Sequence, residues 1–87
     1  MSALSVTPED RAASLVIENE RAVRGMPKAE LARRAGISLR TVTYYLDGER
    51  AMTLGAFRAL CGVLDISHQE AANRLDRVLA SLDDSTE

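Results

Sequence analysis

The most informative part of the sequence is the stretch KAELARRAGISLRTVTYYLDG, which runs from Lys28 to Gly48. Apolar residues recur in it with the spacing of an amphipathic helix, first over residues 28–35 and again over residues 39–46. Gly36 separates the two patterns, and a residue without a Cβ atom can end a helix in the left-handed conformation at no steric cost. The stretch therefore predicts two short helices joined by a tight turn.

Each of these two helices is predicted to bury one face. The inward residues of the first are Leu31, Ala32 and Ala35, and those of the second are Val42, Tyr45 and Leu46. Ser38 is placed to cap the second helix, because its hydroxyl can accept a hydrogen bond from the first turn. The outward face of the second helix then consists of Leu39, Arg40, Thr43, Tyr44 and Asp47.

A longer helix is predicted over residues 8–24. Thr7 followed by Pro8 is a strong start signal, and Gly25 is placed to stop the helix. Its inward stripe is predicted to comprise Ala12, Leu15, Val16, Asn19, Ala22 and Val23. Ala13 and Ile17 lie beside this stripe, and they either widen the buried face or contact a partner.

Two further helices follow the decisive stretch. Thr53 is the predicted cap of a helix that reaches about residue 64, and its inward residues are Leu54, Phe57, Leu60, Cys61 and Leu64. Ser67 and Glu70 form an S-x-x-E pattern, which predicts a capping box at the start of the last helix. The inward stripe of that helix comprises Ala71, Ala72, Leu75, Val78, Leu79 and Leu82.

Two features of these helices leave alternatives open. Gly55 and Gly62 weaken a helix by roughly 1 kcal/mol each relative to alanine, so either a neighbour approaches closely there or the two glycines are simply tolerated. The apolar stripe of the last helix also continues after the rest of the domain should be nearly covered. Its distal residues pack either against the first helix or against a second copy of the chain, and they are Val78, Leu79 and Leu82.

Charge is distributed unevenly along the chain. Residues 21–50 contain seven basic and three acidic side chains, a net charge of +4, whereas residues 1–20 and 51–87 each carry a net charge of −3. A basic middle between acidic flanks favours a protein that presents one face to a polyanion. The alternative is a mixed surface without such a role.

Composition argues against several other classes of protein. With 87 residues, 46% of them apolar, the chain is predicted to form one domain over residues 1–87, with an arm at 1–6 and a frayed acidic tail at 83–87. It has no apolar run suited to a membrane span and no signal-peptide pattern, which favours a cytoplasmic protein. Cys61 is expected to be a core residue, and His68 is the single histidine. Neither has neighbours spaced as metal ligands, so we expect no metal, no cofactor and no enzymatic activity.

The outward face of the helix over residues 39–46 has the chemistry of a DNA reader. An arginine near a helix N-terminus, such as Arg40, can pair with O6 and N7 of guanine. Thr43 and Tyr44 offer apolar contact to thymine methyl groups. Asp47 would be repelled by phosphate unless it lies past the groove or contacts a cytosine amine, and DNA contact is expected to end near it. The hydroxyl of Tyr45 is expected to reach the rim of the fold, where it meets either a phosphate or a backbone group.

The start of the helix over residues 28–35 suggests a phosphate site. Met26 and Pro27 have no side-chain acceptor for the exposed amides of its first turn. Those N–H groups, with Lys28 beside them, form a natural seat for a phosphate oxygen, and water fills it when no ligand is bound.

Taken together, these residues resemble the Cro and phage-repressor family of helix-turn-helix proteins, also described as lambda-repressor-like or XRE-type. The resemblance covers about residues 10–80, and its core is the pattern L-A-x-x-x-G-I-S-x-x-T-V. The positions that carry it are Leu31, Ala32, Gly36, Ile37, Ser38, Thr41, Val42, Gly48, Leu60 and Leu64. The resemblance implies a compact all-α domain of five helices, with the helix-turn-helix at helices two and three. It also implies sequence-specific binding to double-stranded operator DNA, usually as a homodimer that represses transcription.

The resemblance also implies roles for individual residues. Those that would read bases are Leu39, Arg40, Thr43 and Tyr44. The predicted phosphate contacts are Lys28, Ser38, Tyr45 and Arg50, together with the amides of the helix over residues 28–35. The chain departs from the family at Lys28, where glutamine is common, and at Leu46 and Asp47, where polar or basic residues are common. A second hypothesis keeps the fold but applies it to a protein partner, as an antitoxin or a phage factor that binds a host protein would.

Overall fold

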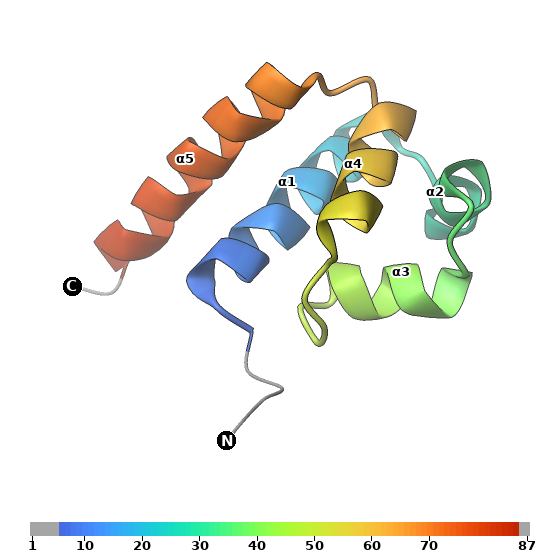
Figure 1. The fold of residues 1–87 in the computed structure, drawn as a ribbon, viewed down its shortest axis with the longest axis horizontal. Helices are drawn as coiled ribbons and strands as arrows, with labels where there is room; N and C mark the ends of the chain where they lie inside the picture. Colours follow the sequence, from blue (N-terminus) through green and yellow to red (C-terminus); the bar gives the residue numbers. More distant parts are fainter. Residues whose placement is uncertain (1–5, 86–87) are drawn as a thin grey trace.

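Five helices make up residues 6–85, the part of the chain that the computed structural model describes (Figure 1). They are α1 (Pro8–Arg24), α2 (Lys28–Ala35), α3 (Leu39–Leu46), α4 (Leu54–Val63) and α5 (His68–Ser85). No strand occurs in these residues. The predicted all-α fold of five helices is confirmed, and α5 and α1 lie side by side while α2 and α3 occupy the opposite end of the molecule.

Side-chain caps begin four of the five helices. Thr7 forms a full capping box with Asp10, because the Thr7 hydroxyl accepts from the Asp10 amide at 3.1 Å and the Asp10 carboxylate accepts from the Thr7 amide at 3.0 Å. The hydroxyls of Ser38, Thr53 and Ser67 each accept from the amide three residues on. The capping box predicted at α5 is only half formed, because the carboxylate of its third residue turns to Arg74 and Arg77.

The turns that frame α2 are made by glycines in the left-handed conformation. Gly25 ends α1 with φ of 64°, and Gly36 ends α2 with φ of 73°. A Cβ atom would be strained at either position, so both predicted helix stops are confirmed. The backbone N–H of Gly36 and that of Ile37 return to carbonyls in the last turn of α2, which fixes the direction in which α3 leaves.

One apolar core lies at the centre of the five helices. Its largest fully buried side chains are Ile17, Leu31, Val42, Leu60 and Leu64. Ile17 was predicted either to widen the buried face of α1 or to contact a partner. It belongs to the core, because its side chain is 0% exposed. Cys61, at 3% exposure, is a core residue as predicted, and burial raises the pKa of its thiol.

Some of the predicted inward residues are exposed. Val23 is 81% exposed and Leu54 is 73% exposed, and Asn19, Ala22 and Ala72 also face solvent. Val23 lines a groove between α1 and α5 together with Arg74 and Arg77, and most of its side chain stays in contact with solvent. Leu54 is the first residue of α4 and lies at the edge of the core. These predictions were wrong because helical spacing does not indicate where a neighbouring helix stops.

Polar side chains join α1 to α5 outside the core. The Glu20 carboxylate accepts from Arg24 at 2.7 Å and from Arg74 at 2.9 Å, and Arg74 also donates to Glu70 at 2.8 Å. The hydrogen bonds from Arg24 and Arg74 hold the pKa of Glu20 below its usual range. This cluster fixes the position of the first half of α5, and Val78 beyond it packs against the core.

The two ends of the chain are described only in part. Of the predicted arm at 1–6, residues 1–5 lie outside the described residues. Residues 83–85 of the predicted frayed tail belong to α5, and residues 86–87 are again outside the description. The extent of the domain over residues 1–87 stays a prediction. None of the described helices has the length and apolar character needed to cross a bilayer.

We expect Gly62→Ala to raise the free energy of unfolding by about 0.5–1 kcal/mol. A Cβ atom added at Gly55 or Gly62 meets nothing within 4 Å, so a close neighbour does not explain these glycines. Alanine then stabilises α4 by restricting the unfolded chain. Urea denaturation measures the change, and Gly36→Ala is the control, because φ of 73° should make that substitution destabilising. Loss of stability in Gly62→Ala would contradict the open space around that position.

Candidate nucleic-acid interface

Helix α3 is held by its inner face and leaves its outer face open. Val42 is fully buried and Tyr45 is 7% exposed. In addition, the buried hydroxyl of Ser14 on α1 donates to the backbone carbonyl of Tyr45 at 2.7 Å, across 31 residues of sequence. The inner face of α3 is therefore fixed by apolar packing and by one buried hydrogen bond to α1.

Ser14 is a positioning residue that the sequence did not indicate. Ser14 lies between Ala12 and Val16 on the buried side of α1. A polar residue among these apolar ones was the only feature of the sequence that could have indicated a buried hydrogen bond. We expect Ser14→Ala to lower the free energy of unfolding by about 1 kcal/mol, since the Tyr45 carbonyl loses its side-chain donor. Chemical denaturation measures this loss, and Ser81→Ala on the exposed side of α5 should stay within about 0.5 kcal/mol of the wild type. Equal stability of Ser14→Ala and Ser81→Ala would contradict the role of the bond.

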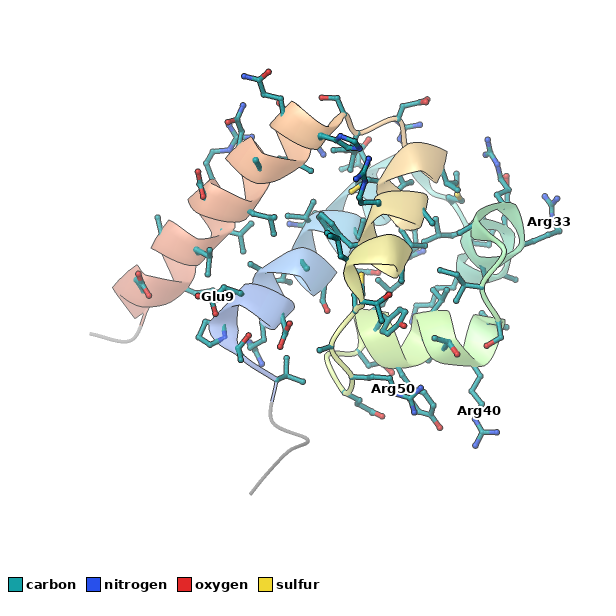
Figure 2. The ribbon with its side chains drawn as sticks, in the orientation of Figure 1. Glu9, Arg33, Arg40 and Arg50 are labelled. Carbon is teal, nitrogen blue, oxygen red and sulfur yellow. The ribbon has the colours of Figure 1, made fainter. Side chains whose placement is uncertain are left out.

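The outward residues of α3 lie where the sequence placed them. Leu39 is 48% exposed, Arg40 is exposed, and Thr43 and Tyr44 are partly exposed. The Thr43 hydroxyl donates to the Leu39 carbonyl at 2.9 Å, which leaves its methyl group as the outward contact. Figure 2 shows Arg40 and Arg50 projecting from the same side of the molecule, beside α3, and Arg33 projecting from α2 in another direction.

Three of these side chains form a cluster around one ring. The Nε atom of Arg40 donates to the Tyr44 hydroxyl at 3.2 Å. The guanidinium carbons of Arg40 and Arg50 lie 5.9 and 4.9 Å from the centroid of the Tyr44 ring, within the range of a cation–π contact. The structure thus joins a residue of the loop after α3 to two residues of the helix itself.

The groups predicted to contact phosphate differ in the partners that they already have within the chain. Pro27 precedes α2 and gives it no side-chain cap. The prediction that no side chain caps the amides of the first turn is thereby confirmed. Lys28 lies beside those amides, with its Nζ atom 3.8 Å from a carboxylate oxygen of Asp47. The Ser38 hydroxyl is engaged with Thr41.

Tyr45 is the predicted phosphate contact that the structure places deepest. Its side chain belongs to the core cluster, and 7% of its surface is exposed. Only this small exposed part of the side chain is available for a contact outside the fold. Arg50, by contrast, is exposed in the loop between α3 and α4.

A family model described as a helix-turn-helix domain matches residues 9–75, a range that includes α1 to α4 whole or nearly so and the first part of α5. The chain belongs to this helix-turn-helix domain family. The family lies within the Cro/C1-type, or XRE, clan, and this confirms the predicted resemblance. The chain has no significant match among curated proteins or among solved structures.

As a helix-turn-helix domain, the chain is a DNA-binding domain, of a family that is typically not enzymatic. Its helix-turn-helix comprises α2, the turn at Gly36 and α3. Among the described residues, no group of three or more His, Cys, Asp and Glu side chains is arranged to hold a metal ion. His68, the single histidine of the sequence, is exposed and contacts Arg58.

Proposed function

We propose that this domain regulates transcription by binding operator DNA in a sequence-specific manner, as proteins of the Cro/C1 type do. The observation that carries the proposal is the outer face of α3. It presents Arg40 among the uncharged side chains of Leu39, Thr43 and Tyr44, on a helix whose inner face is fixed to α1 and to the core. A helix presented in this way fits the major groove, where base edges can be read.

In this proposal the remaining contacts orient the domain on the backbone. Lys28, Arg50 and the uncapped amides of α2 contact phosphates, with Ser38 and the exposed edge of Tyr45 as further contacts. Because phosphate contacts carry no sequence information, specificity rests on the outer face of α3.

A selection from random oligonucleotides tests the proposal. We expect an enriched inverted repeat whose half-sites lie about 34 Å apart, which is one turn of the duplex. Affinity for the selected duplex should fall steeply between low and moderate salt, since each neutralised phosphate releases counterions. A pool without enriched sequences, or binding that changes little with salt, would contradict the proposal.

An inverted repeat requires two copies of the chain, and α5 is the surface that we propose for their contact. Val78 packs partly on the core of its own chain, while Leu79 and Leu82 each keep part of their side chains exposed. Sedimentation equilibrium on the selected duplex should give two copies per inverted repeat. One copy per repeat at saturation would contradict this part of the proposal.

We expect Asp47→Asn to tighten binding to all duplexes by about two- to fivefold at low salt. Asp47 lies 3.8 Å from Lys28 and competes with phosphate for its ammonium group, and a surface pair of this kind corresponds to about 0.2–1 kcal/mol. Fluorescence anisotropy on selected and random duplexes measures the change. Asp76→Asn on the exposed side of α5 makes the same change of charge and should have a smaller effect. Equal effects of the two substitutions would mean that Asp47 acts only through net charge.

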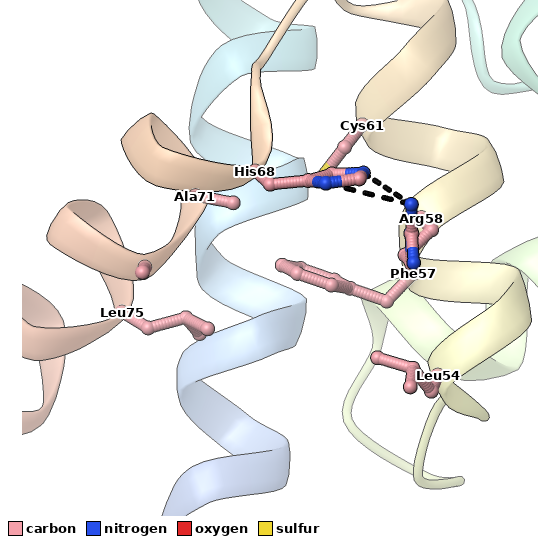
Figure 3. Close-up of a pocket in the computed structure, with 8 residues that line it drawn as sticks. Leu54, Phe57, Arg58, Cys61, His68, Ala71 and Leu75 are labelled. Atoms are coloured by element: carbon pink, nitrogen blue, oxygen red, sulfur yellow. Dashed lines mark hydrogen bonds between the residues drawn. The ribbon is translucent and has the colours of Figure 1, made fainter.

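A second candidate function is binding to a protein partner on the same fold. The observation that favours it is an apolar groove of about 300 Å³ between α4 and α5, beside the exposed Leu54 (Figure 3). Phe57 and Leu75 face each other across it, and Arg58 and His68 lie at one end. Co-purification of a stoichiometric protein partner, without retained DNA and without an enriched sequence in the selection, would favour this function over DNA binding.

A further inference from the structure

The Tyr44 side chain contacts two arginines, Arg40 and Arg50, and a simple apolar contact to DNA would not require either of them. Arg40 and Tyr44 are four residues apart, so they lie one helical turn apart on the same face of α3. The Tyr44 hydroxyl accepts from the Nε atom of Arg40 at 3.2 Å. A guanidinium group carries five N–H donors, one on Nε and two on each terminal nitrogen. This bond therefore engages the one donor on Nε and does not use the four donors of the two terminal nitrogens.

Arg50 fixes the ring itself. Its guanidinium carbon lies 4.9 Å from the ring centroid, closer than that of Arg40 at 5.9 Å. Within the described residues, neither Arg40 nor Arg50 forms a salt bridge, so no carboxylate competes for either group. The ring is thus held between its own helix and the loop that follows it.

We propose that Tyr44 is a positioning residue that selects guanine at one position of the DNA site. It holds Arg40 so that the two terminal nitrogens point outward together, and this end-on pair matches the acceptors O6 and N7 of guanine. Adenine presents N7 next to an amino donor, which cannot accept from the second nitrogen. The inference rests on the proposed function, and it assigns to Tyr44 a role through Arg40 rather than through its own contact to a base.

A modified base tests this role directly. The probes are the selected duplex and the same duplex with 7-deazaguanine in place of the guanine that Arg40 reads, which removes only the N7 acceptor. Wild-type protein should bind the modified duplex about tenfold more weakly, and Arg40→Ala should bind the two duplexes equally. Tyr44→Phe, which keeps the ring and removes the hydroxyl, should lower the tenfold ratio to less than about threefold.

Two controls distinguish a loss of positioning from a general effect of the substitution on binding or folding. Ser81→Ala removes a hydroxyl from the exposed side of α5 and should keep the full ratio, and thermal unfolding checks that Tyr44→Phe stays folded. If wild-type protein binds its selected duplex but Tyr44→Phe keeps the tenfold ratio, the positioning role is overturned and the proposed function stands. If wild-type protein enriches no sequence at all, the proposed function fails, and the role of Tyr44 fails with it.

Discussion

Replacing Arg40 with alanine should weaken binding to the selected duplex by about 1–3 kcal/mol, roughly 5- to 150-fold, and relax specificity at one base pair. The side chain is exposed at the second position of α3, and within the described residues it has no carboxylate partner that would have to be broken on binding. On the proposed function, the substitution removes a bidentate pair with guanine, and no neighbouring side chain of α3 can replace that pair. Competition binding with duplexes that carry each base at that position measures the effect.

Arg33→Ala is the matched control for this prediction. Arg33 is also exposed and carries the same charge, but it projects from α2 in another direction (Figure 2). Its loss should reduce affinity for selected and random duplexes alike, through the general attraction to phosphate. Equal losses on the two duplexes in Arg40→Ala would remove Arg40 from the residues that read bases.

Replacing Leu31 with alanine should lower the free energy of unfolding by about 2–5 kcal/mol. Leu31 is 0% exposed and lies on α2, which packs against both α3 and α4. Alanine leaves a cavity where these three helices meet, and domains of this kind have a total stability of only about 5–15 kcal/mol. The variant should therefore also bind DNA more weakly at temperatures near its unfolding midpoint.

Urea denaturation of Leu31→Ala and Leu54→Ala provides the comparison. Both substitutions remove the same atoms, but Leu54 is 73% exposed, so its replacement should change stability by no more than about 0.5 kcal/mol. Similar destabilisation by the two substitutions would mean that the burial of Leu31 does not govern its contribution.

Helix boundaries were predictable because the signals that set them are local. The hydroxyls of Thr7, Ser38 and Thr53 cap the helices that they were predicted to cap, and Gly25 and Gly36 end theirs. Each of these residues acts on backbone groups within a few positions of itself. The exposure of Val23 and Leu54 was not predictable in the same way, since it depends on where a neighbouring helix ends in space.

In the candidate site, too, the features set by local sequence were predictable and the contacts between distant segments were not. Helical spacing placed Leu39, Arg40, Thr43 and Tyr44 on one open face, because residues of a single short helix fix their own geometry. Contacts between distant segments could not be obtained from spacing. The bond from Ser14 to the Tyr45 carbonyl spans 31 residues, and the ion pair of Lys28 with Asp47 joins the start of one helix to the end of another.

The packing of α1 against α5 has a consequence for the synthesis of the protein. α1 is made first among the described helices and α5 last, yet α1 makes its most extensive contacts with α5. A nascent chain that still lacks α5 exposes the face of α1 that α5 would cover, and α1 is also the helix that holds α3 through Ser14. If the domain binds operator DNA as proposed, the outer face of α3 should be held in place less firmly before α5 has been made, and a chain that lacks α5 should bind the operator more weakly.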